Sequence, residues 1–397
     1  MPYLRRFSRR VCQRNRSLQT QPGTRRHRAS RHCRPSSRCR SSLREARASR
    51  ATSRPHIRHI THQRAGRGGR MTPAGGRACY YLVGSTGVPN YGDELVAATW
   101  LRHLAEVAPE ADVWLDCQEP GSAQVLLDGL HPRARFVDTL WQLCRLAPSA
   151  EPWQVASWVQ RAIRDPGLAP RRVAGIEMLV RADVVHLIGG GDITAMWPGL
   201  VGVLAGAAAA TRRSGGHAVM TGQGLYPPVP GTSPLLRSLV EQFDIVDVRD
   251  EPSAEVAGCR STTRLTCDDV FLRLGAGVLD LVDGAGPVPE YMVCAQSDAS
   301  DVDTPRLAAH ILHTLRSWQA EPEQVGVIEG IPGADREVYS LIEHELPGAR
   351  FYPFNKLWTD GLPLGPHQWW ISTRFHFHLL AAAAGAGGLA PSVHPEY

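Results

Sequence analysis

Arg374, His376 and His378 follow an apolar stretch, Trp369–Ser372, near the C-terminal end of the chain. A guanidinium holds a carboxylate or phosphate through paired hydrogen bonds. An imidazole exchanges protons at neutral pH because its ordinary pKa lies there. Arg374 with His376, at a predicted strand-to-helix junction, therefore favours anion binding combined with acid–base catalysis by His376. His378 enters the predicted helix, and we expect it to be structural.

The same two histidines could instead indicate a metal site. The sequence offers no further cluster of His, Cys or Asp close to them. A catalytic zinc ion generally needs a third protein ligand. We therefore predict that the protein holds no metal.

A second arginine, Arg249, follows another apolar run in the stretch VDVRDEPS. An arginine at this position suits a carboxylate or phosphate group, so Arg249 and Arg374 are the predicted donor-binding residues. The alternative for Arg249 is an ion pair with Asp250 or Glu251. Asp250 could also begin a helix as its N-terminal cap.

Four further loops contain glycine or acidic residues just after predicted strands, at the edge where open α/β sheets bind ligands. The first, VGSTGVPNYGDE, matches neither of the usual phosphate-loop patterns, and simple capping of the next helix is its alternative role. The candidate cleft residues of the four loops are Asn90, Gly92 and Asp93; Gly189, Gly190 and Gly191; Gly222 and Gly224; and Asp268.

Continuous apolar runs such as Val184–Ile188 are typical of parallel strands that are covered on both faces. Strands are predicted at 79–83, 113–116, 134–137, 184–188, 217–221, 245–248, 264–267, 291–295, 325–329, 350–352, 369–372 and 387–393. Helices are predicted near 93–106, 153–164, 172–182, 199–213, 233–242, 304–319, 335–345 and 376–384.

This alternation predicts an α/β protein of two Rossmann-like domains. The predicted domains span 78–274 and 290–397, joined by a Gly- and Pro-rich linker at 275–289. The second domain lacks a closing helix, so we expect it to be truncated at its C-terminus.

The charge of the chain is divided unevenly. Residues 1–70 contain 21 Arg and one acid, which gives +20, so the total of +6 leaves −14 for the remaining residues. We expect 1–77 to be a disordered extension. A nucleic-acid-binding arm and an organellar transit peptide are alternatives to an over-extended start before Met71. The acidic remainder argues against nucleic acid as a partner.

The nine cysteines are scattered and form no CxxC pair. Most of those after Met71 lie in apolar segments, where a free cysteine behaves as a small apolar side chain. No signal peptide or membrane-spanning run is visible. These features favour a reducing, cytoplasmic location.

The order of the loop motifs resembles that of the polysaccharide pyruvyl transferase family. The motifs are N-x-G-D, G-G-G-D, G-x-G-x-x-P, V-R-D-x-x-S, D-x-x-F-L and S-x-R-F-H, and the resemblance covers about Tyr80 to Leu389. It implies two Rossmann-like domains similar to the GT-B glycosyltransferases. It also identifies Asn90–Asp93 with the first cleft loop. The family normally continues through a further strand and helix, and it has no counterpart of the Arg-rich block.

The resemblance implies transfer of a pyruvyl group from phosphoenolpyruvate, as a ketal, to a sugar of a cell-surface polysaccharide or its precursor. Phosphoenolpyruvate is then a substrate, and no cofactor is expected. The acceptor would be a saccharide or a lipid-linked glycan, which could bring the protein to a membrane surface. The alternatives are a nucleotide-sugar glycosyltransferase of the same architecture, because the fold does not fix the donor, and an inactive saccharide-binding relative.

Overall fold

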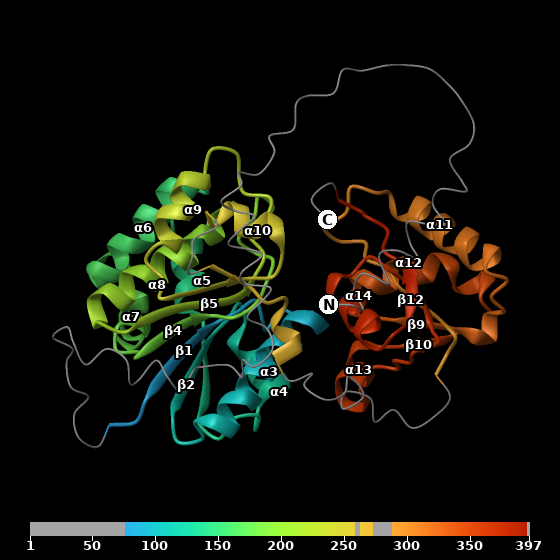
Figure 1. The fold of residues 1–397 in the computed structure, drawn as a ribbon, viewed down its shortest axis with the longest axis horizontal. Coiled ribbons are helices and arrows are strands. Elements are labelled where there is room, and N and C mark those ends of the chain that lie inside the picture. The colour runs from blue at the N-terminus through green and yellow to red at the C-terminus, as the bar shows by residue number, and fades with distance from the viewer. Residues whose placement is uncertain (1–75, 259–262, 273–287, 395–397) are drawn as a thin grey trace, which may run out of the picture. The chain divides into compact units, whose positions relative to one another are not determined.

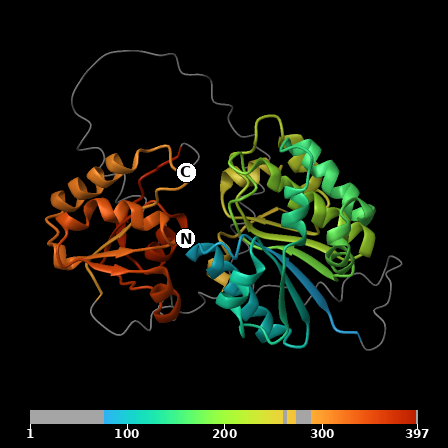
Figure 2. The same cartoon turned by 180° about the vertical axis from the view of Figure 1, so that it is seen from behind.

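The computed structural model describes residues 76–258, 263–272 and 288–394 (Figures 1 and 2). These residues form two compact units, and each is considered by itself. The N-terminal unit holds 76–88, 93–258 and 263–272, and the C-terminal unit holds 288–394 together with Pro89–Gly92. The predicted extension, up to residue 75, and most of the predicted linker lie outside the described residues.

The N-terminal unit contains a seven-stranded parallel sheet in the order β3-β2-β1-β4-β5-β6-β7. Its strands are β1 (Cys79–Val83), β2 (Asp112–Asp116), β3 (Ala134–Val137), β4 (Val184–Leu187), β5 (His217–Gln223), β6 (Ile245–Val248) and β7 (Thr263–Leu265). The direction of the strand order reverses between β1 and β4: β2 and β3 follow on one side of β1, and β4 to β7 follow on the other. At such a reversal the loops that follow the two strands diverge and leave a crevice.

Helices connect these strands and cover the sheet (Figure 1). They are α3 (Tyr91–Val107), α4 (Pro120–Leu127), α5 (Thr139–Arg145), α6 (Pro152–Arg164), α7 (Val173–Leu179), α8 (Val201–Ser214), α9 (Ser233–Val240) and α10 (Glu251–Val256). Short 3₁₀ helices are η2 (Pro166–Leu168), η3 (Pro170–Arg172), η4 (Pro198–Leu200) and η5 (Asp269–Leu272).

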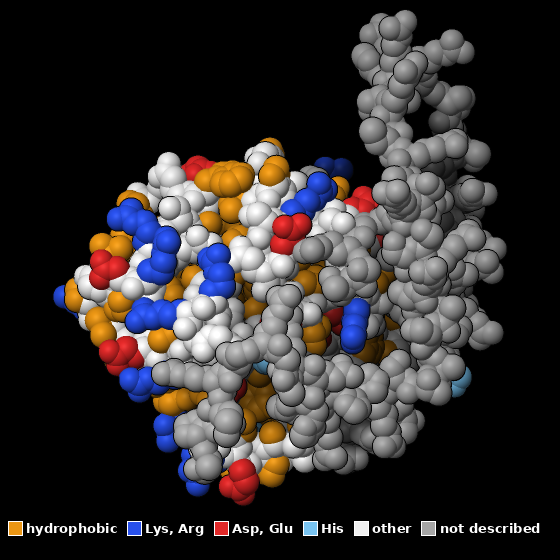
Figure 3. Space-filling model, turned by 60° about the vertical axis from the view of Figure 1, so that its left-hand side comes forward, with side chains coloured by type: hydrophobic (Ala, Val, Ile, Leu, Met, Phe, Trp, Pro, Cys, Tyr) orange, Lys and Arg blue, Asp and Glu red, His pale blue; other side chains and the backbone are white. Residues whose placement is uncertain are grey.

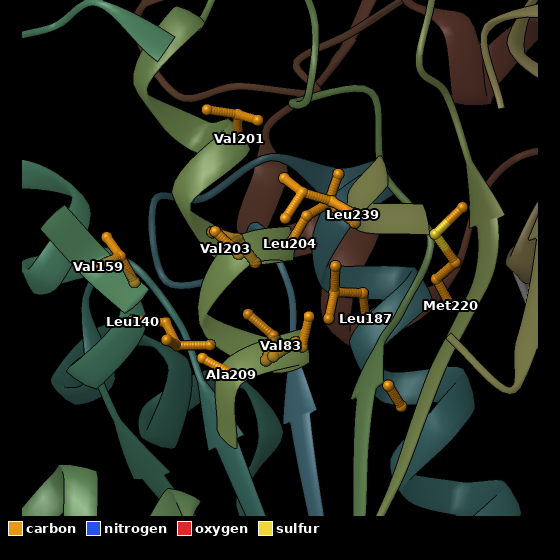
Figure 4. Packing of buried hydrophobic residues seen from close by; sticks show 14 of the residues in the cluster. Val83, Leu140, Val159, Leu187, Val201, Val203, Leu204, Ala209, Met220 and Leu239 are labelled. Atoms are coloured by element: carbon orange, nitrogen blue, oxygen red, sulfur yellow. The ribbon is translucent and has the colours of Figure 1, made fainter. Parts of the chain in front are cut away.

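The main apolar core of this unit lies between the sheet and α8, which is rich in alanine and almost entirely buried. Val83 and Leu187 contribute from the strands, Leu140 and Val159 from α5 and α6, and Leu204 from α8 (Figure 4). Small side chains along α8 let α5 and α6 pack closely against it. This packing fixes the carboxyl ends of β1 and β4, where the candidate loops begin.

The C-terminal unit contains a five-stranded parallel sheet in the order β10-β9-β8-β11-β12. Its strands are β8 (Tyr291–Cys294), β9 (Val325–Ile328), β10 (Arg350–Tyr352), β11 (Trp369–Ser372) and β12 (Gly387–Leu389). Its helices are α11 (Thr304–Ser317), η7 (Pro322–Gln324), α12 (Ala334–Ile342), η8 (Glu343–Glu345), α13 (Phe354–Asp360) and α14 (Phe375–Ala383). Ile311, Val325 and Val338 lie in the core of this unit.

Two parallel α/β sheets confirm the predicted fold class of two Rossmann-like domains. The prediction omitted four short helices, α4, α5, α10 and α13. It also extended the last strand to residue 393, whereas β12 ends at Leu389. On the face drawn in Figure 3, basic and acidic side chains are scattered among apolar ones rather than gathered into one patch.

Candidate functional site

Arg249 follows β6 and lies between two glycine loops of the N-terminal unit. A Cβ atom added to Gly191 would lie 2.8 Å from Arg249 Nη2, and one added to Gly224 would lie 2.6 Å from Nε. The Gly224 N–H donates to the Gly190 carbonyl at 2.7 Å, which ties the loops after β4 and β5 together. The absence of side chains at Gly191 and Gly224 therefore makes the space that the guanidinium occupies.

Acidic groups also lie near this guanidinium. Its Nη1 is 3.9 Å from Asp268 Oδ2, and its Nε is 3.5 Å from Asp250 Oδ2. Asp250 additionally caps α10, because its Oδ1 accepts from the Ser253 N–H at 2.8 Å. The ion-pair alternative and the helix cap foreseen for this stretch are thus both present, while the Arg249 side chain keeps 13% of its surface exposed.

A buried carboxylate, Asp269, holds the two glycine loops in place. Its Oδ2 accepts hydrogen bonds from the Gly189 N–H at 2.8 Å, Thr221 Oγ1 at 2.6 Å and Trp100 Nε1 at 2.7 Å. Burial raises the pKa of Asp269 to about 7, although these donors lower it. Gly222 has a φ of +56°, and a Cβ there would lie 2.7 Å from Asp269 Oδ1, so the loop requires glycine.

Glu94, next to the predicted Asp93, helps to hold the first loop. Glu94 is fully buried in the first turn of α3, and it accepts from Thr86 Oγ1 and, at 2.7 Å, from the Gly87 N–H. Burial raises the pKa of Glu94 even though these hydrogen bonds lower it. Asp93, the predicted residue, is only partly buried in the same turn. Asn90 Oδ1 accepts from the Gly92 N–H at 3.2 Å, which is the capping alternative considered for this loop.

In the C-terminal unit, Arg374 lies between the end of β11 and the start of α14, and it is engaged by two carboxylates. Its Nη2 is 2.6 Å from Asp335 Oδ1 and 2.5 Å from Asp298 Oδ1. Burial lowers the pKa of Arg374, but the charges and hydrogen bonds of Asp335 and Asp298 together outweigh that effect and raise the pKa above its ordinary value. Asp335 also accepts from the Gly330 and Ile331 N–H groups, so this pair joins three loops of the unit.

His376 lies in the first turn of α14 and is 9% exposed. Gly92, which belongs to the same unit, is its close neighbour, because a Cβ there would lie 1.9 Å from His376 Nδ1. Any side chain at position 92 would displace the imidazole. His378 follows two residues later in α14, and burial lowers its pKa to about 4. Its imidazole is therefore neutral at physiological pH.

The predicted residues thus fall into two clusters, one in each unit. Gly189–Gly191, Gly222, Gly224, Arg249 and Asp268 meet in the N-terminal unit, and Asn90, Gly92, Arg374 and His376 belong to the C-terminal unit. Sequence reasoning missed Asp269, Glu94 and Asp335, which orient these residues. Asp269 is adjacent to the predicted Asp268, and Asp335 is the first residue of a predicted helix. Acidic residues at the ends of predicted strands and helices were therefore the sequence feature that could have identified them.

Within the described ranges, no group of three His, Cys, Asp or Glu side chains is arranged to hold a metal ion. No helix among the same residues is long and apolar enough to cross a bilayer.

The family model described as polysaccharide pyruvyl transferase matches residues 90–387. The chain belongs to this family. It is therefore a member of a family of transferases, and the match covers both clusters described above. The roles predicted for individual residues of this pyruvyl transferase relative stay predictions.

Several solved structures are similar to the chain at low sequence identity. UDP-GlcNAc 2-epimerase from Neisseria meningitidis, bound to UDP-GlcNAc, is 11% identical, with 79% of this chain and 82% of that chain covered and a TM-score of 0.47. Anabaena Alr3699/HepE in complex with UDP-glucose is 17% identical, with 80% and 81% covered and a TM-score of 0.42. A putative UDP-N-acetylglucosamine 2-epimerase from Listeria monocytogenes is 13% identical, with 75% of each chain covered and a TM-score of 0.42. A search of curated protein sequences found no match.

Proposed function

We propose that the protein transfers a pyruvyl group from phosphoenolpyruvate to a sugar of a cell-surface polysaccharide or its precursor, forming a ketal. Family membership supports this proposal, and one observation links it to a particular residue. Arg249 lies in a glycine-lined space at the carboxyl edge of a parallel sheet, partly exposed and with its guanidinium held by neighbouring loops. That geometry suits recognition of a carboxylate or phosphate.

The chemistry requires two additions to one carbon. A proton is added to the methylene carbon of phosphoenolpyruvate, and a sugar hydroxyl attacks C2. The bond between C2 and the bridging oxygen then breaks, inorganic phosphate leaves, and a second hydroxyl adds to C2. Two hydroxyl protons are released in all: one balances the proton added to carbon, and the other leaves with phosphate.

His376 is the residue that we assign to proton transfer. Its imidazole is mostly buried beside Gly92, at the start of α14, so its position is fixed by close packing. A fixed base or acid is what such a step needs, since geometry precedes pKa in deciding whether a group can act.

Arg374 is the second proposed donor-binding group, but its charge is shared. Asp335 and Asp298 both contact its guanidinium, whereas the acids near Arg249 lie 3.5 Å and 3.9 Å away. We assign donor binding to Arg249 and Arg374 together. In this proposal Arg374 also fixes the loop that leads into His376.

We further propose a cytoplasmic location, with any membrane contact made through a lipid-linked acceptor. Among the described residues, Cys79, Cys117, Cys144 and Cys294 are free thiols, as is usual in a reducing compartment.

Product analysis tests the proposal. The full chain is incubated with phosphoenolpyruvate and a crude cell-surface glycan, and proton NMR of the glycan is recorded for the methyl singlet of a pyruvyl ketal. The proposal expects this signal together with phosphate release. Transfer of sugar from a UDP-sugar, with no ketal signal from phosphoenolpyruvate, would favour the glycosyltransferase alternative and overturn it.

A further inference from the structure

The Arg374 guanidinium binds two different carboxylates of the C-terminal unit along two of its edges. Its Nε and Nη2 donate to Asp335 Oδ1 at 3.0 Å and 2.6 Å. Its Nη1 and Nη2 donate to Asp298 Oδ2 and Oδ1 at 3.4 Å and 2.5 Å. Asp298 therefore contacts the outer edge of the guanidinium with both carboxylate oxygens. This is the paired arrangement in which an arginine recognises a carboxylate or a phosphate.

The two carboxylates differ in burial and in what else holds them. The Asp335 side chain is 1% exposed, and it also accepts from the Gly330 and Ile331 N–H groups at 2.7 Å and 2.9 Å. The Asp298 side chain is 43% exposed. An ion pair with an exposed partner is weak, because water and salt compete for the charges. Asp335 is thus a fixed partner of Arg374, whereas another anion can replace Asp298.

The loop after β8 presents the Asp298 side chain on a fixed backbone. Gln296, which is buried, donates from Nε2 to the Asp298 carbonyl at 2.9 Å. Ala299 has a φ of +46°, a conformation that is uncommon for residues other than glycine. The main chain is therefore defined on both sides of Asp298, and rotation of its side chain alone is enough to uncover Arg374.

The formal charges of this cluster favour the same exchange. One guanidinium beside two carboxylates leaves an excess of one negative charge, so the cluster with Asp298 in place does not attract a further anion. An anion that takes the position of the Asp298 carboxylate meets Nη1 and Nη2 already arranged for paired hydrogen bonds. The Asp298 carboxylate and an anionic ligand therefore exclude each other from this edge.

We propose that Asp298 is a built-in competitor of the donor, and that its carboxylate covers Arg374 until an anionic group of phosphoenolpyruvate displaces it. The inference rests on the proposed donor-binding role of Arg374 and adds a regulatory contact to it. Such a competitor lowers the apparent affinity for the donor, because only the molecules with Arg374 uncovered can bind it fully.

Calorimetric titration of the full chain with phosphoenolpyruvate, in the absence of an acceptor, measures this effect. Asp298→Asn nearly preserves the size of the side chain and removes its charge. It should bind phosphoenolpyruvate about 2- to 10-fold more tightly than wild type, as expected for loss of a partly exposed competing ion pair. Asp301→Asn is the matched control, since Asp301 follows on the same loop, is 63% exposed and lies 3.8 Å from His394 instead. It should bind as wild type does.

Three results would overturn the proposal. Equal or weaker binding by Asp298→Asn would show that Asp298 positions Arg374 rather than competing with the donor. An equal gain in Asp301→Asn would show a general effect of charge on the loop. Absence of binding by both wild type and Asp298→Asn would show that no donor site is present for Asp298 to cover.

A kinetic arm separates this inference from the proposed function. With phosphoenolpyruvate and a crude glycan, Asp298→Asn should lower the donor KM by a similar factor and leave the acceptor KM unchanged. Pyruvyl transfer with an unchanged donor KM would refute the role of Asp298 and leave the proposed function standing. Tighter binding of phosphoenolpyruvate by Asp298→Asn, without any ketal product, would refute pyruvyl transfer and leave the competition standing.

Discussion

Arg249 and Arg374 are both arginines at strand ends, yet their surroundings give them different tasks. The Arg374 guanidinium forms ion pairs with the carboxylates of Asp335 and Asp298, so it links neighbouring loops of the C-terminal unit. The Arg249 guanidinium occupies the space left by the absence of side chains at Gly191 and Gly224, and carboxylate oxygens of Asp250 and Asp268 lie 3.5 Å and 3.9 Å from it.

Arg249→Ala should therefore raise the KM for phosphoenolpyruvate by about 10- to 100-fold, as expected for loss of a charged hydrogen-bonding partner. Steady-state kinetics with varied donor would measure this. Arg316→Ala is the control, because Arg316 pairs with Glu345 on an exposed surface of the C-terminal unit and should leave the donor KM unchanged. An unchanged donor KM in Arg249→Ala would rule out its donor-binding role.

Asp269 makes the stability of the N-terminal unit depend on pH. Its pKa is about 7 in the folded protein and about 3.9 in an unfolded chain. The folded state thus holds the proton more tightly, so this group's contribution to stability is complete below about pH 4 and is lost as pH rises through 7. Asn at this position cannot ionise, while its side-chain oxygen can still accept from Thr221 and Gly189.

We predict that the free energy of unfolding of Asp269→Asn, relative to that of wild type, rises by about 1–3 kcal/mol when the pH is raised from 5 to 8. Urea unfolding of both proteins at the two pH values measures the difference. A difference that stays constant with pH would show that Asp269 does not titrate in this range.

At the scale of elements, the glycine loops after β4 and β5 are the parts that set the position of Arg249. A methyl group at residue 191 or 224 would lie under 3 Å from the guanidinium, so the arginine or the loop must move. Gly199, in η4, has open space at its Cβ position and serves as the control.

Gly191→Ala and Gly224→Ala should each lower kcat/KM for the donor by about 10-fold or more, since small displacements of a positioning group are costly in catalysis. Their circular dichroism spectra should match that of wild type. Gly199→Ala should retain near wild-type kcat/KM. Equal activity of all three variants would show that the loops do not position Arg249.

Strands were easier to predict from the sequence than the short helices. Continuous apolar runs such as Val184–Leu187 identify buried parallel strands, since few other structures tolerate them. The helices α5 and α13 have seven residues each, too short to show a helical period clearly. Asp250 was foreseen as a helix cap, and the cap is present although the helix itself, α10, was not assigned.

The positions of site residues could be predicted because parallel strands end at one edge of a sheet. The residues that contact these site residues could not be predicted. Arg374 contacts Asp335 and Asp298, which are 39 and 76 residues away in the sequence, and no local pattern encodes such a pairing. The buried position of Glu94 could not be predicted either, because spacing alone does not tell which of two neighbouring acids faces the interior.

At the scale of the whole molecule, composition separates residues 1–70, at +20, from the remainder, at −14. All of the candidate site residues lie in the remainder. A chain that begins at Met71 should therefore keep the melting temperature and the donor kinetics of the full chain. Differential scanning calorimetry and a donor titration would show this, and a clear fall in melting temperature would mean that the first 70 residues contribute to stability.

The central claim, that His376 moves a proton during pyruvyl transfer, is tested most directly by phosphate release from phosphoenolpyruvate in the presence of the glycan acceptor. We predict acceptor-dependent release by wild type, and a loss of about 10²–10⁴-fold in turnover for His376→Ala with the donor KM nearly unchanged. His378→Ala, which alters a neutral histidine two residues further along α14, should keep most of the turnover. Full turnover by His376→Ala would contradict the account.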